Sequence, residues 1–217
     1  IQMMGHPVTL LHGVTSSGKT EIYIHLIQKA IDEHKQVLYL LPEIALTVQI
    51  TERLKAVFGN RLGIYHSKYS DAERVEIWQK QLSTQPYDVI LGARSAVFLP
   101  FQRLGLVIID EEHEQSFKQQ DPAPRYHARS AAIVLAQMYA GAKTLLGTAT
   151  PSMETYYNAQ QGKYGLVELT RRYKDIHLPA IEVVDVKDLY RRKMMTGPFS
   201  PRLLAADRKS TRLNSSH

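Results

Sequence analysis

The sequence reads Gly13-Val14-Thr15-Ser16-Ser17-Gly18-Lys19-Thr20 near its start, and this stretch fits the pattern GxxxxGK[ST]. Residues 9–11 before it are predicted to form a strand, and residues 19–31 after it form an amphipathic helical pattern. A glycine-rich turn between a strand and a helix lets backbone N–H groups and the helix N-terminus surround phosphate oxygens. The stretch therefore predicts a phosphate loop, with a plain glycine turn as the alternative.

Two side chains at the end of the loop have the chemistry to bind a nucleotide with its metal ion. Lys19 would reach the β- and γ-phosphates, and the Thr20 hydroxyl would ligate the Mg²⁺ that bridges the same phosphates. We therefore predict ATP and Mg²⁺ as cofactors. The predicted nucleotide-binding residues are Gly13, Val14, Thr15, Ser16, Ser17, Gly18, Lys19 and Thr20.

Short apolar runs rich in β-branched residues alternate with longer amphipathic stretches along the chain. This rhythm is typical of a parallel sheet with crossover helices. Ser70 and Asp71 supply a capping start for a helix over residues 72–82. The predicted fold class is α/β, a RecA-like phosphate-loop NTPase domain with a mainly parallel sheet flanked by helices. The expected strands are residues 9–11, 37–41, 62–65, 88–91, 106–110, 144–147 and 166–169.

An apolar run over residues 104–109 ends in Asp110-Glu111-Glu112-His113. In open parallel sheets ligands bind at the carboxyl ends of the strands. Asp110 would hold Mg²⁺, through its water shell, and Glu111 would orient and deprotonate the water that attacks the γ-phosphate. We predict Lys19, Asp110 and Glu111 as the catalytic group, with Thr20 and Asp110 at the metal. Acidic residues that merely solvate a strand end are the alternative.

A phosphate loop together with an Asp-Glu-Glu-His box resembles the superfamily 2 helicases. Three segments are similar to that superfamily's motifs Ia, Ib and III in the same order: LPEIALTVQ at 41–49, GARSAVFLPF at 92–101 and GTATPS at 147–152. The strings KQQ at 118–120 and RYHAR at 125–129 narrow the resemblance to the replication-restart helicases, the primosomal protein N-prime family. The likeness runs over about residues 8–205.

The resemblance implies that motifs Ia and Ib line the path of a nucleic-acid strand. Arginine offers a planar fork of donors for phosphate, although Arg94 could equally be a structural ion-pair partner. Thr148 and Thr150 are similar to residues that couple the nucleotide state to the grip on DNA, with a simple turn as the alternative. The candidate phosphate contacts are Thr47, Gln49, Arg94 and Ser95.

Residues 113–129 resemble the aromatic-rich loop of these helicases, which senses single-stranded DNA. Aromatic side chains are expected to stack on unpaired bases, and basic ones, including Arg129, to contact the backbone. The segment continues directly from Glu111, so we expect strand binding to reach the catalytic water; an inert surface loop is the alternative. The predicted DNA-binding or coupling residues here are His113, Phe117, Lys118, Arg125 and Tyr126.

The composition is that of a soluble globular protein with one sizeable core: 217 residues, 44% hydrophobic and 22% charged. No apolar stretch approaches the length of a membrane span and no leader opens the chain, so we expect a cytoplasmic protein without a membrane partner. The net charge of +6 is weak support for any partner, because Arg208, Lys209 and Arg212 lie within the last ten residues. The lack of cysteine excludes disulfides and cysteine-bound zinc within these residues.

We expect three parts along the chain. Residues 1–170 would be the first helicase lobe, residues 171–206 the start of a connection toward a second lobe, and residues 207–217 an unrelated tail from truncation or an assembly artefact. The resemblance places an N-terminal DNA-binding region, inserted zinc and the arginine fingers of the second lobe outside this chain. The isolated chain is therefore expected to bind MgATP, to turn it over poorly and not to unwind DNA.

The resemblance implies ATP-driven 3′-to-5′ translocation on DNA at stalled forks, leading to primosome assembly. The implied partners are forked and single-stranded DNA, single-strand-binding protein and other primosome proteins. Three alternatives remain open at this point. The chain could belong to another superfamily 2 helicase acting on other DNA or on RNA, to a phosphate-loop phosphotransferase, or to a non-catalytic nucleotide-binding module.

Overall fold

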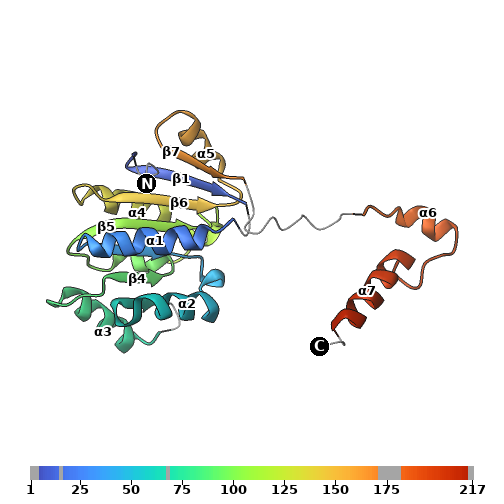
Figure 1. Ribbon diagram of the computed structural model, residues 1–217, viewed down its shortest axis with the longest axis horizontal. Helices are drawn as coiled ribbons and strands as arrows, with labels where there is room; N and C mark the ends of the chain where they lie inside the picture. The colour runs from blue at the N-terminus through green and yellow to red at the C-terminus, as the bar shows by residue number, and fades with distance from the viewer. Residues whose placement is uncertain (1–4, 15–16, 67–68, 171–181, 215–217) are drawn as a thin grey trace. The chain divides into compact units, whose positions relative to one another are not determined.

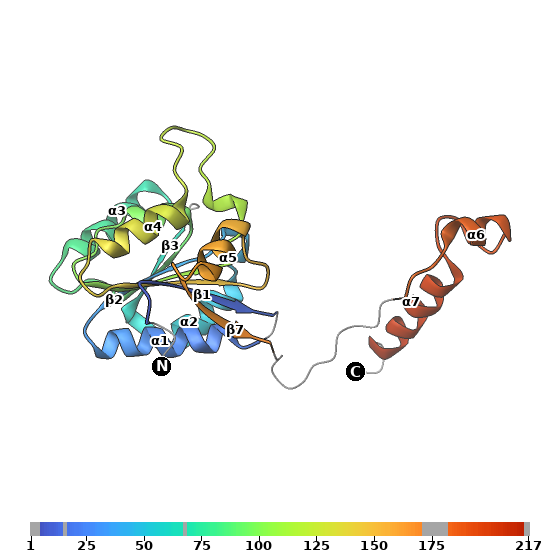
Figure 2. The ribbon, with the colours of Figure 1, turned by 90° about the horizontal axis from the view of Figure 1, so that it is seen from above.

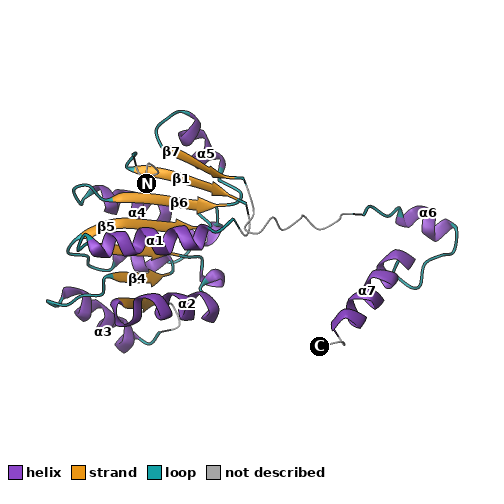
Figure 3. Cartoon of the chain, in the orientation of Figure 1, coloured by secondary structure: helices purple, strands orange, loops and turns teal. Residues whose placement is uncertain are grey.

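The structure, a computed structural model, describes residues 5–14, 17–66, 69–170 and 182–214. It contains two compact units, Ile1–Asp175 and Ile176–His217, which we describe separately. In the larger unit a seven-stranded sheet lies between two layers of helices (Figures 1 and 3).

The sheet consists of seven strands, one at each position predicted from the sequence. They are β1 (Val8–Gly13), β2 (Gln36–Leu40), β3 (Leu62–Tyr65), β4 (Val89–Gly92), β5 (Leu104–Asp110), β6 (Lys143–Thr148) and β7 (Gly165–Leu169). Their order is β3-β4-β2-β5-β6-β1-β7, and every pairing is parallel. The predicted α/β class is confirmed. Because β6 lies between β5 and β1, the GTATPS segment lies between the acidic box and the phosphate loop.

Helices cover both faces of the sheet, as Figure 2 shows. On one face lie α1 (Lys19–Asp32) and α2 (Val48–Phe58). On the other lie α3 (Asp71–Leu82), α4 (Ala128–Gln137) and α5 (Met153–Gln160). Among the described residues, the connections contain four short 3₁₀ helices: η2 (Glu43–Ala45), η3 (Gly59–Arg61), η4 (Arg94–Phe98) and η5 (Gln115–Phe117).

The apolar core forms two clusters, one on each face of the sheet. All of β2 and nearly all of β5 are buried, which is why these strands are continuous apolar runs. Helix α1 buries Tyr23, Ile27, Ala30 and Ile31. The amphipathic pattern predicted over residues 19–31 did not single out Tyr23, whose hydroxyl lies at the candidate site.

The N-terminus of α3 confirms the capping prediction. The Ser70 hydroxyl accepts a hydrogen bond from the Glu73 N–H at 3.3 Å, and the Ser70 N–H donates to the Glu73 carboxylate at 2.8 Å. This reciprocal arrangement satisfies two otherwise unpaired donors. The pKa of Glu73 is lowered, because the Ser70 N–H and the Ser70 hydroxyl both donate hydrogen bonds to its charged carboxylate.

The smaller unit contains α6 (Val186–Arg191) and α7 (Pro201–Asn214). Helix α7 continues across the boundary expected after residue 206, so no break in secondary structure marks that boundary. The expected connection falls partly on residues 171–181, and the end of the expected tail on residues 215–217; both lie outside the described residues. None of the helices within the described ranges is long and apolar enough to cross a membrane.

Candidate nucleotide-binding and hydrolysis site

The phosphate loop connects the end of β1 to the start of α1, as predicted. Gly18, which caps α1, has a φ of +87°, a left-handed conformation that glycine adopts without steric cost. The Lys19 ammonium donates to the Gly13 carbonyl at 2.8 Å and so connects the two ends of the loop. Two predicted nucleotide-binding residues, Thr15 and Ser16, lie outside the described residues.

The described part of the loop fits a phosphate ligand. The side-chain hydroxyl of Ser17 is buried and has no hydrogen-bond partner among the residues that the structure describes. Buried hydroxyls normally have partners, so this donor suits a ligand oxygen. Thr20 lies half-buried in the first turn of α1, where the helix N-terminus favours negative charge. Together with Lys19, these groups can bind the phosphates of a nucleotide.

Asp110 ends β5 at the carboxyl edge of the sheet. Its Oδ1 accepts hydrogen bonds from the Tyr23 hydroxyl at 2.9 Å and from the Glu111 N–H at 3.1 Å. Burial raises the pKa of Asp110, while the Tyr23 hydrogen bond and the Lys19 charge act in the opposite direction. A bound cation would favour the ionised form that can ligate it.

The donors at this edge fit Mg²⁺. Thr20 and Asp110 supply a hydroxyl and a carboxylate, the oxygen ligands that Mg²⁺ combines with phosphates and water. Across the described ranges, no group of three or more His, Cys, Asp or Glu side chains is placed to hold a metal ion. Mg²⁺ bound with a nucleotide needs no such cage.

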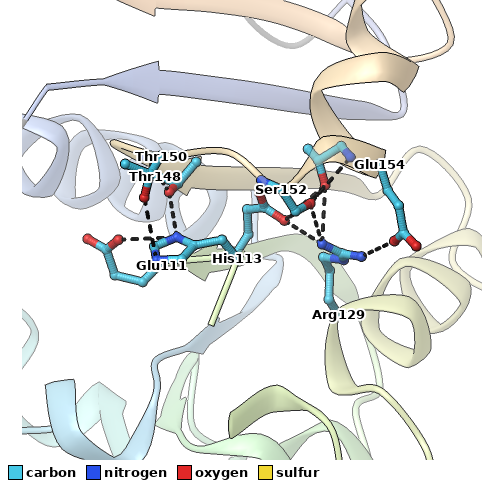
Figure 4. A network of polar contacts seen from close by, with 9 residues as sticks. Glu111, His113, Arg129, Thr148, Thr150, Ser152 and Glu154 are labelled. Atoms are coloured by element: carbon cyan, nitrogen blue, oxygen red, sulfur yellow. Dashed lines mark hydrogen bonds and ion pairs between the residues drawn. The ribbon is translucent and has the colours of Figure 1, made fainter. Parts of the chain in front are cut away.

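Glu111 and His113 lie directly beyond Asp110, and His113 contacts the GTATPS segment (Figure 4). Glu111 has a φ of +50°, which is uncommon for a residue with a side chain and typical of functional sites. Its carboxylate lies 3.7 Å from His113 Nδ1, and the same nitrogen lies 2.8 Å from the Thr148 hydroxyl. The Thr150 hydroxyl lies 3.5 Å from His113 Nε2. His113 therefore connects the predicted base with both predicted coupling threonines.

Glu112 is fully buried, and its carboxylate accepts four hydrogen bonds. They come from the Ser152 N–H at 2.7 Å, the Ser152 hydroxyl at 3.1 Å, the Thr155 hydroxyl at 2.9 Å and Arg129 at 2.6 Å. The other terminal guanidinium nitrogen of Arg129, Nη2, donates to the Glu154 carboxylate at 2.7 Å. The expectation that Arg129 contacts a DNA backbone is wrong, because its side chain is only 10% exposed and its guanidinium pairs with two carboxylates.

The aromatic residues of the aromatic-rich loop, residues 113–129, are arranged differently from the prediction. Phe117 is only 1% exposed and packs in the apolar core, so the expectation that it offers a stacking face is wrong. A large apolar ring gains more from burial than from solvent exposure. Tyr126 is half-buried, and its ring meets Phe98 edge to face at 4.7 Å between centroids. Phe98 is 53% exposed, so the accessible aromatic surface belongs to this pair.

Arg94 holds the base of the loop. One guanidinium nitrogen donates to the carbonyl oxygens of Ser116 at 3.3 Å and Lys118 at 3.2 Å. A backbone bridge between Lys118 and His127 closes the loop, and the Lys118 ammonium donates to the Arg125 carbonyl at 3.0 Å. Arg94 is thus a structural partner of backbone carbonyls, and its contact with DNA stays a prediction.

A pocket of about 410 Å³ lies where motif Ia, motif Ib and the loop meet. Its lining includes Glu43, Arg94, Ser95, Lys118 and Gln120. The predicted DNA contacts of motif Ia lie outside this pocket, exposed at the start of α2. Here the Thr47 hydroxyl accepts a long hydrogen bond of 3.5 Å from the N–H of Ile50. Gln49 follows it on the same exposed turn.

The family profile described as DEAD/DEAH box helicase matches residues 2–159. The chain belongs to the DEAD/DEAH box helicase family. In this family member the profile covers the phosphate loop, the acidic box and the GTATPS segment, the parts that the fold brings to one edge of the sheet.

Curated relatives of this DEAD/DEAH box protein carry the name replication restart protein PriA. The protein of Bacillus subtilis (strain 168) is 44% identical over 183 residues, which are 84% of this chain and 22% of the relative. That of Rickettsia felis is 49% identical over 178 residues, 82% and 27% of the two chains. That of Haemophilus influenzae is 42% identical over 201 residues, 93% and 27%. The chain spans about a quarter of the length of these relatives.

Solved structures with a similar fold include RecG bound to a three-way DNA junction, with a TM-score of 0.53 and 21% identity. That match covers 86% of this chain and 24% of the RecG chain. The helicase MrfA bound to DNA matches with a TM-score of 0.54 and 18% identity, over 76% of this chain and 25% of its own. At this identity the likeness shows the fold alone, and it agrees with the RecA-like prediction.

Sequence reasoning missed three residues of this DEAD/DEAH box site. Tyr23 follows Thr20 by three positions, so one helical turn places both on the same face; this spacing could have revealed it. Phe98 lies in motif Ib beside several other apolar residues, and nothing in its spacing marks it as exposed. Glu112 was given no role of its own in the acidic box, because the groups that donate to it come from segments distant in sequence.

Proposed function

We propose that this chain is the ATP-binding lobe of a DNA helicase or translocase that acts at stalled replication forks to restart replication. The observation that carries the proposal is the arrangement of Lys19, Thr20, Asp110 and Glu111 at one edge of a parallel sheet in a DEAD/DEAH box domain. The name replication restart protein shared by the relatives supports the cellular role.

Each catalytic side chain has a separate task in hydrolysis. Bound Mg²⁺ supplies positive charge beside the β- and γ-phosphates. Lys19 binds the same phosphates once its ammonium leaves the Gly13 carbonyl. Asp110 would help to hold the metal ion, and Glu111 would accept a proton from the attacking water. The residues of the loop from Gly13 to Thr20, including Thr15 and Ser16, would complete the nucleotide site.

The DNA path is proposed to run over motif Ia, motif Ib and the loop. The Phe98–Tyr126 pair offers an aromatic surface for an unpaired base, and base stacking of this kind tolerates any sequence. Arg94, Ser95 and Lys118 line the adjacent pocket. RecG and MrfA, which share this fold, are bound to DNA in their solved structures, and this supports DNA as the ligand. Thr47, Gln49 and Arg125 would add exposed polar contacts.

Two side-chain connections provide a route from the loop to the hydrolysis site. Arg129, two residues beyond the loop's closing bridge, holds Glu112, and Glu112 adjoins Glu111. His113 lies between Glu111 and Thr148. We propose that a strand bound on the loop shifts these contacts and thereby the position of Glu111. Thr150 lies beside the His113 ring, so a movement of His113 would also shift Thr150 and the DNA path next to it.

Several properties of the intact protein follow from the family resemblance and are part of this proposal. They are 3′-to-5′ polarity, forked and single-stranded DNA as substrates, single-strand-binding protein and primosome proteins as partners, zinc outside this chain, and a cytoplasmic location. The chain spans about a quarter of its relatives, so these properties concern the longer protein.

ATP hydrolysis by the protein extended to its natural ends tests the proposal. The rate is measured without nucleic acid and then with forked DNA, single-stranded DNA or RNA, and Lys19→Ala is the control. We expect strong stimulation by DNA that the variant lacks. Stimulation by RNA alone would indicate a different superfamily 2 helicase, and indifference to every nucleic acid would favour a phosphotransferase.

A further inference from the structure

Tyr23 is a fully buried side chain whose hydroxyl reaches the hydrolysis site. It lies on α1 one turn beyond Thr20, and its hydroxyl donates to Oδ1 of Asp110 at 2.9 Å. The Tyr39 ring packs edge to face against it, at 5.5 Å between centroids and 71° between planes. The direction in which this hydroxyl points is therefore fixed by α1, by Tyr39 of β2 and by Asp110 of β5.

The backbone around Asp110 makes room for that hydroxyl. Gly147 on β6 is the register partner of Asp110 on β5. A Cβ at Gly147 would collide with the Tyr23 hydroxyl oxygen and would lie 3.2 Å from Asp110 Oδ1. The first residue of the GTATPS segment is therefore glycine because the hydroxyl passes directly over it.

We propose that Tyr23 is a positioning residue for Mg²⁺, and that Gly147 is the glycine that permits it. The inference rests on the proposed function. Both hydrogen bonds to Asp110, from Tyr23 and from the Glu111 N–H, go to Oδ1. We therefore assign Oδ2 to the hydrated metal. Outer partners that orient a ligating carboxylate set metal affinity, although they never touch the metal.

Tyr23→Phe in the protein extended to its natural ends tests this role, because phenylalanine keeps the ring and removes only the donor. Binding of a fluorescent ATP analogue is measured while free Mg²⁺ is titrated, and again in EDTA. We expect the Mg²⁺ concentration for half-maximal tightening to rise about 10-fold. Affinity in EDTA is expected to stay unchanged, and the Mg²⁺ dependence of ATP hydrolysis to shift in parallel.

Tyr139→Phe is the matched control. It also removes one tyrosine hydroxyl, which donates to the Phe101 carbonyl at 2.7 Å, far from the nucleotide residues in sequence and outside the site. We expect it to leave the Mg²⁺ titration unchanged. A shift of the same size in the control would overturn the proposal, because the effect would not be specific to Asp110.

Gly147→Ala provides a second variant, should Tyr23→Phe fail to fold. The added methyl group would displace the hydroxyl and is expected to shift the Mg²⁺ titration in the same direction. An unchanged titration in a folded variant of either kind, beside a responsive wild type, overturns the proposal, as does an equal loss of affinity with Mg²⁺ and in EDTA. A wild type that binds no nucleotide contradicts the proposed function itself, and the positioning role falls with it.

Discussion

Glu112 shows how much one buried side chain contributes to this fold. Its carboxylate is 0% exposed, and every partner around it is a donor: the Ser152 N–H, the Ser152 and Thr155 hydroxyls, and Arg129. The carboxylate depends on these partners, because an unpaired charge in the interior is strongly unfavourable. The pair joins the acidic box to α4 and α5.

Glu112→Gln is therefore expected to destabilise the chain. The new amide would place donor hydrogens against donors and leave Arg129 without its buried partner. We expect a loss of about 3–5 kcal/mol in the free energy of unfolding, measured by urea denaturation. The control is Glu154→Gln, because Glu154 also pairs with Arg129 but is 79% exposed. This control should cost at most about 1 kcal/mol, and equal losses in the two variants would contradict the prediction.

His127 makes the stability of the loop depend on pH. Burial lowers its pKa below the ordinary value of 6.5, and the nearby charges of Arg129 and Lys118 act in the same direction. Since the unfolded chain binds this proton more readily, stability is full above pH 6.5 and falls as the pH drops below it.

We expect His127→Gln to reduce this acid sensitivity. The urea midpoint, followed from pH 7.5 to 5.0, should fall less steeply in the variant than in the wild type, over roughly the range in which a histidine titrates. The control is His25→Gln, because His25 is exposed on α1. A variant that keeps the wild-type slope would show that His127 does not contribute to it.

At the scale of an element, the loop after the acidic box contains one buried and one partly exposed aromatic residue. Phe117 is part of the core, whereas Phe98 of η4 and Tyr126 form the accessible pair. Arg94 and the bridge between Lys118 and His127 fix the base of the loop. The loop is thus anchored at its base and presents its aromatic surface beside motif Ib.

The two phenylalanines should respond differently to alanine substitution. Phe98→Ala is expected to weaken binding of single-stranded DNA by about 1–3 kcal/mol, the usual worth of one stacked base, without unfolding the chain. Phe117→Ala is expected to cost about 3–5 kcal/mol of folding stability instead. Fluorescence anisotropy at fixed salt and urea denaturation measure the two effects. Unchanged DNA affinity in Phe98→Ala would remove this pair from the proposed DNA path.

At the scale of the whole molecule, the proposed function makes this RecA-like unit one part of a two-lobe motor. In such motors an arginine finger from outside the first lobe stabilises the transition state and contributes about 10³-fold or more to the rate. We expect the chain as printed to bind MgATP, to hydrolyse it at least about 10³-fold more slowly than the protein extended to its natural ends, and not to unwind a forked duplex. Robust unwinding by this chain alone would contradict the prediction.

The sequence by itself determined the fold class and predicted the two ends of the candidate hydrolysis site. The phosphate loop and the acidic box could be predicted because each depends on local chemistry: a glycine turn before a helix, and carboxylates after an apolar strand. The seven strands followed from the same short-range pattern, and the capped start of α3 followed from Ser70 and Asp71. These features depend on neighbours along the chain, and neighbours are what a sequence displays.

Only the tertiary structure decided which side chains meet. The strand order places β6 between β5 and β1, which brings Gly147 beneath the Tyr23 hydroxyl and beside Asp110. It also buries Phe117 and Arg129 while leaving Phe98 exposed. Aromatic and basic residues serve equally well in a core or on a nucleic-acid surface, so their type alone could not separate the two roles. Burial depends on elements far apart in sequence, and the packing of the sheet and its helices settles it.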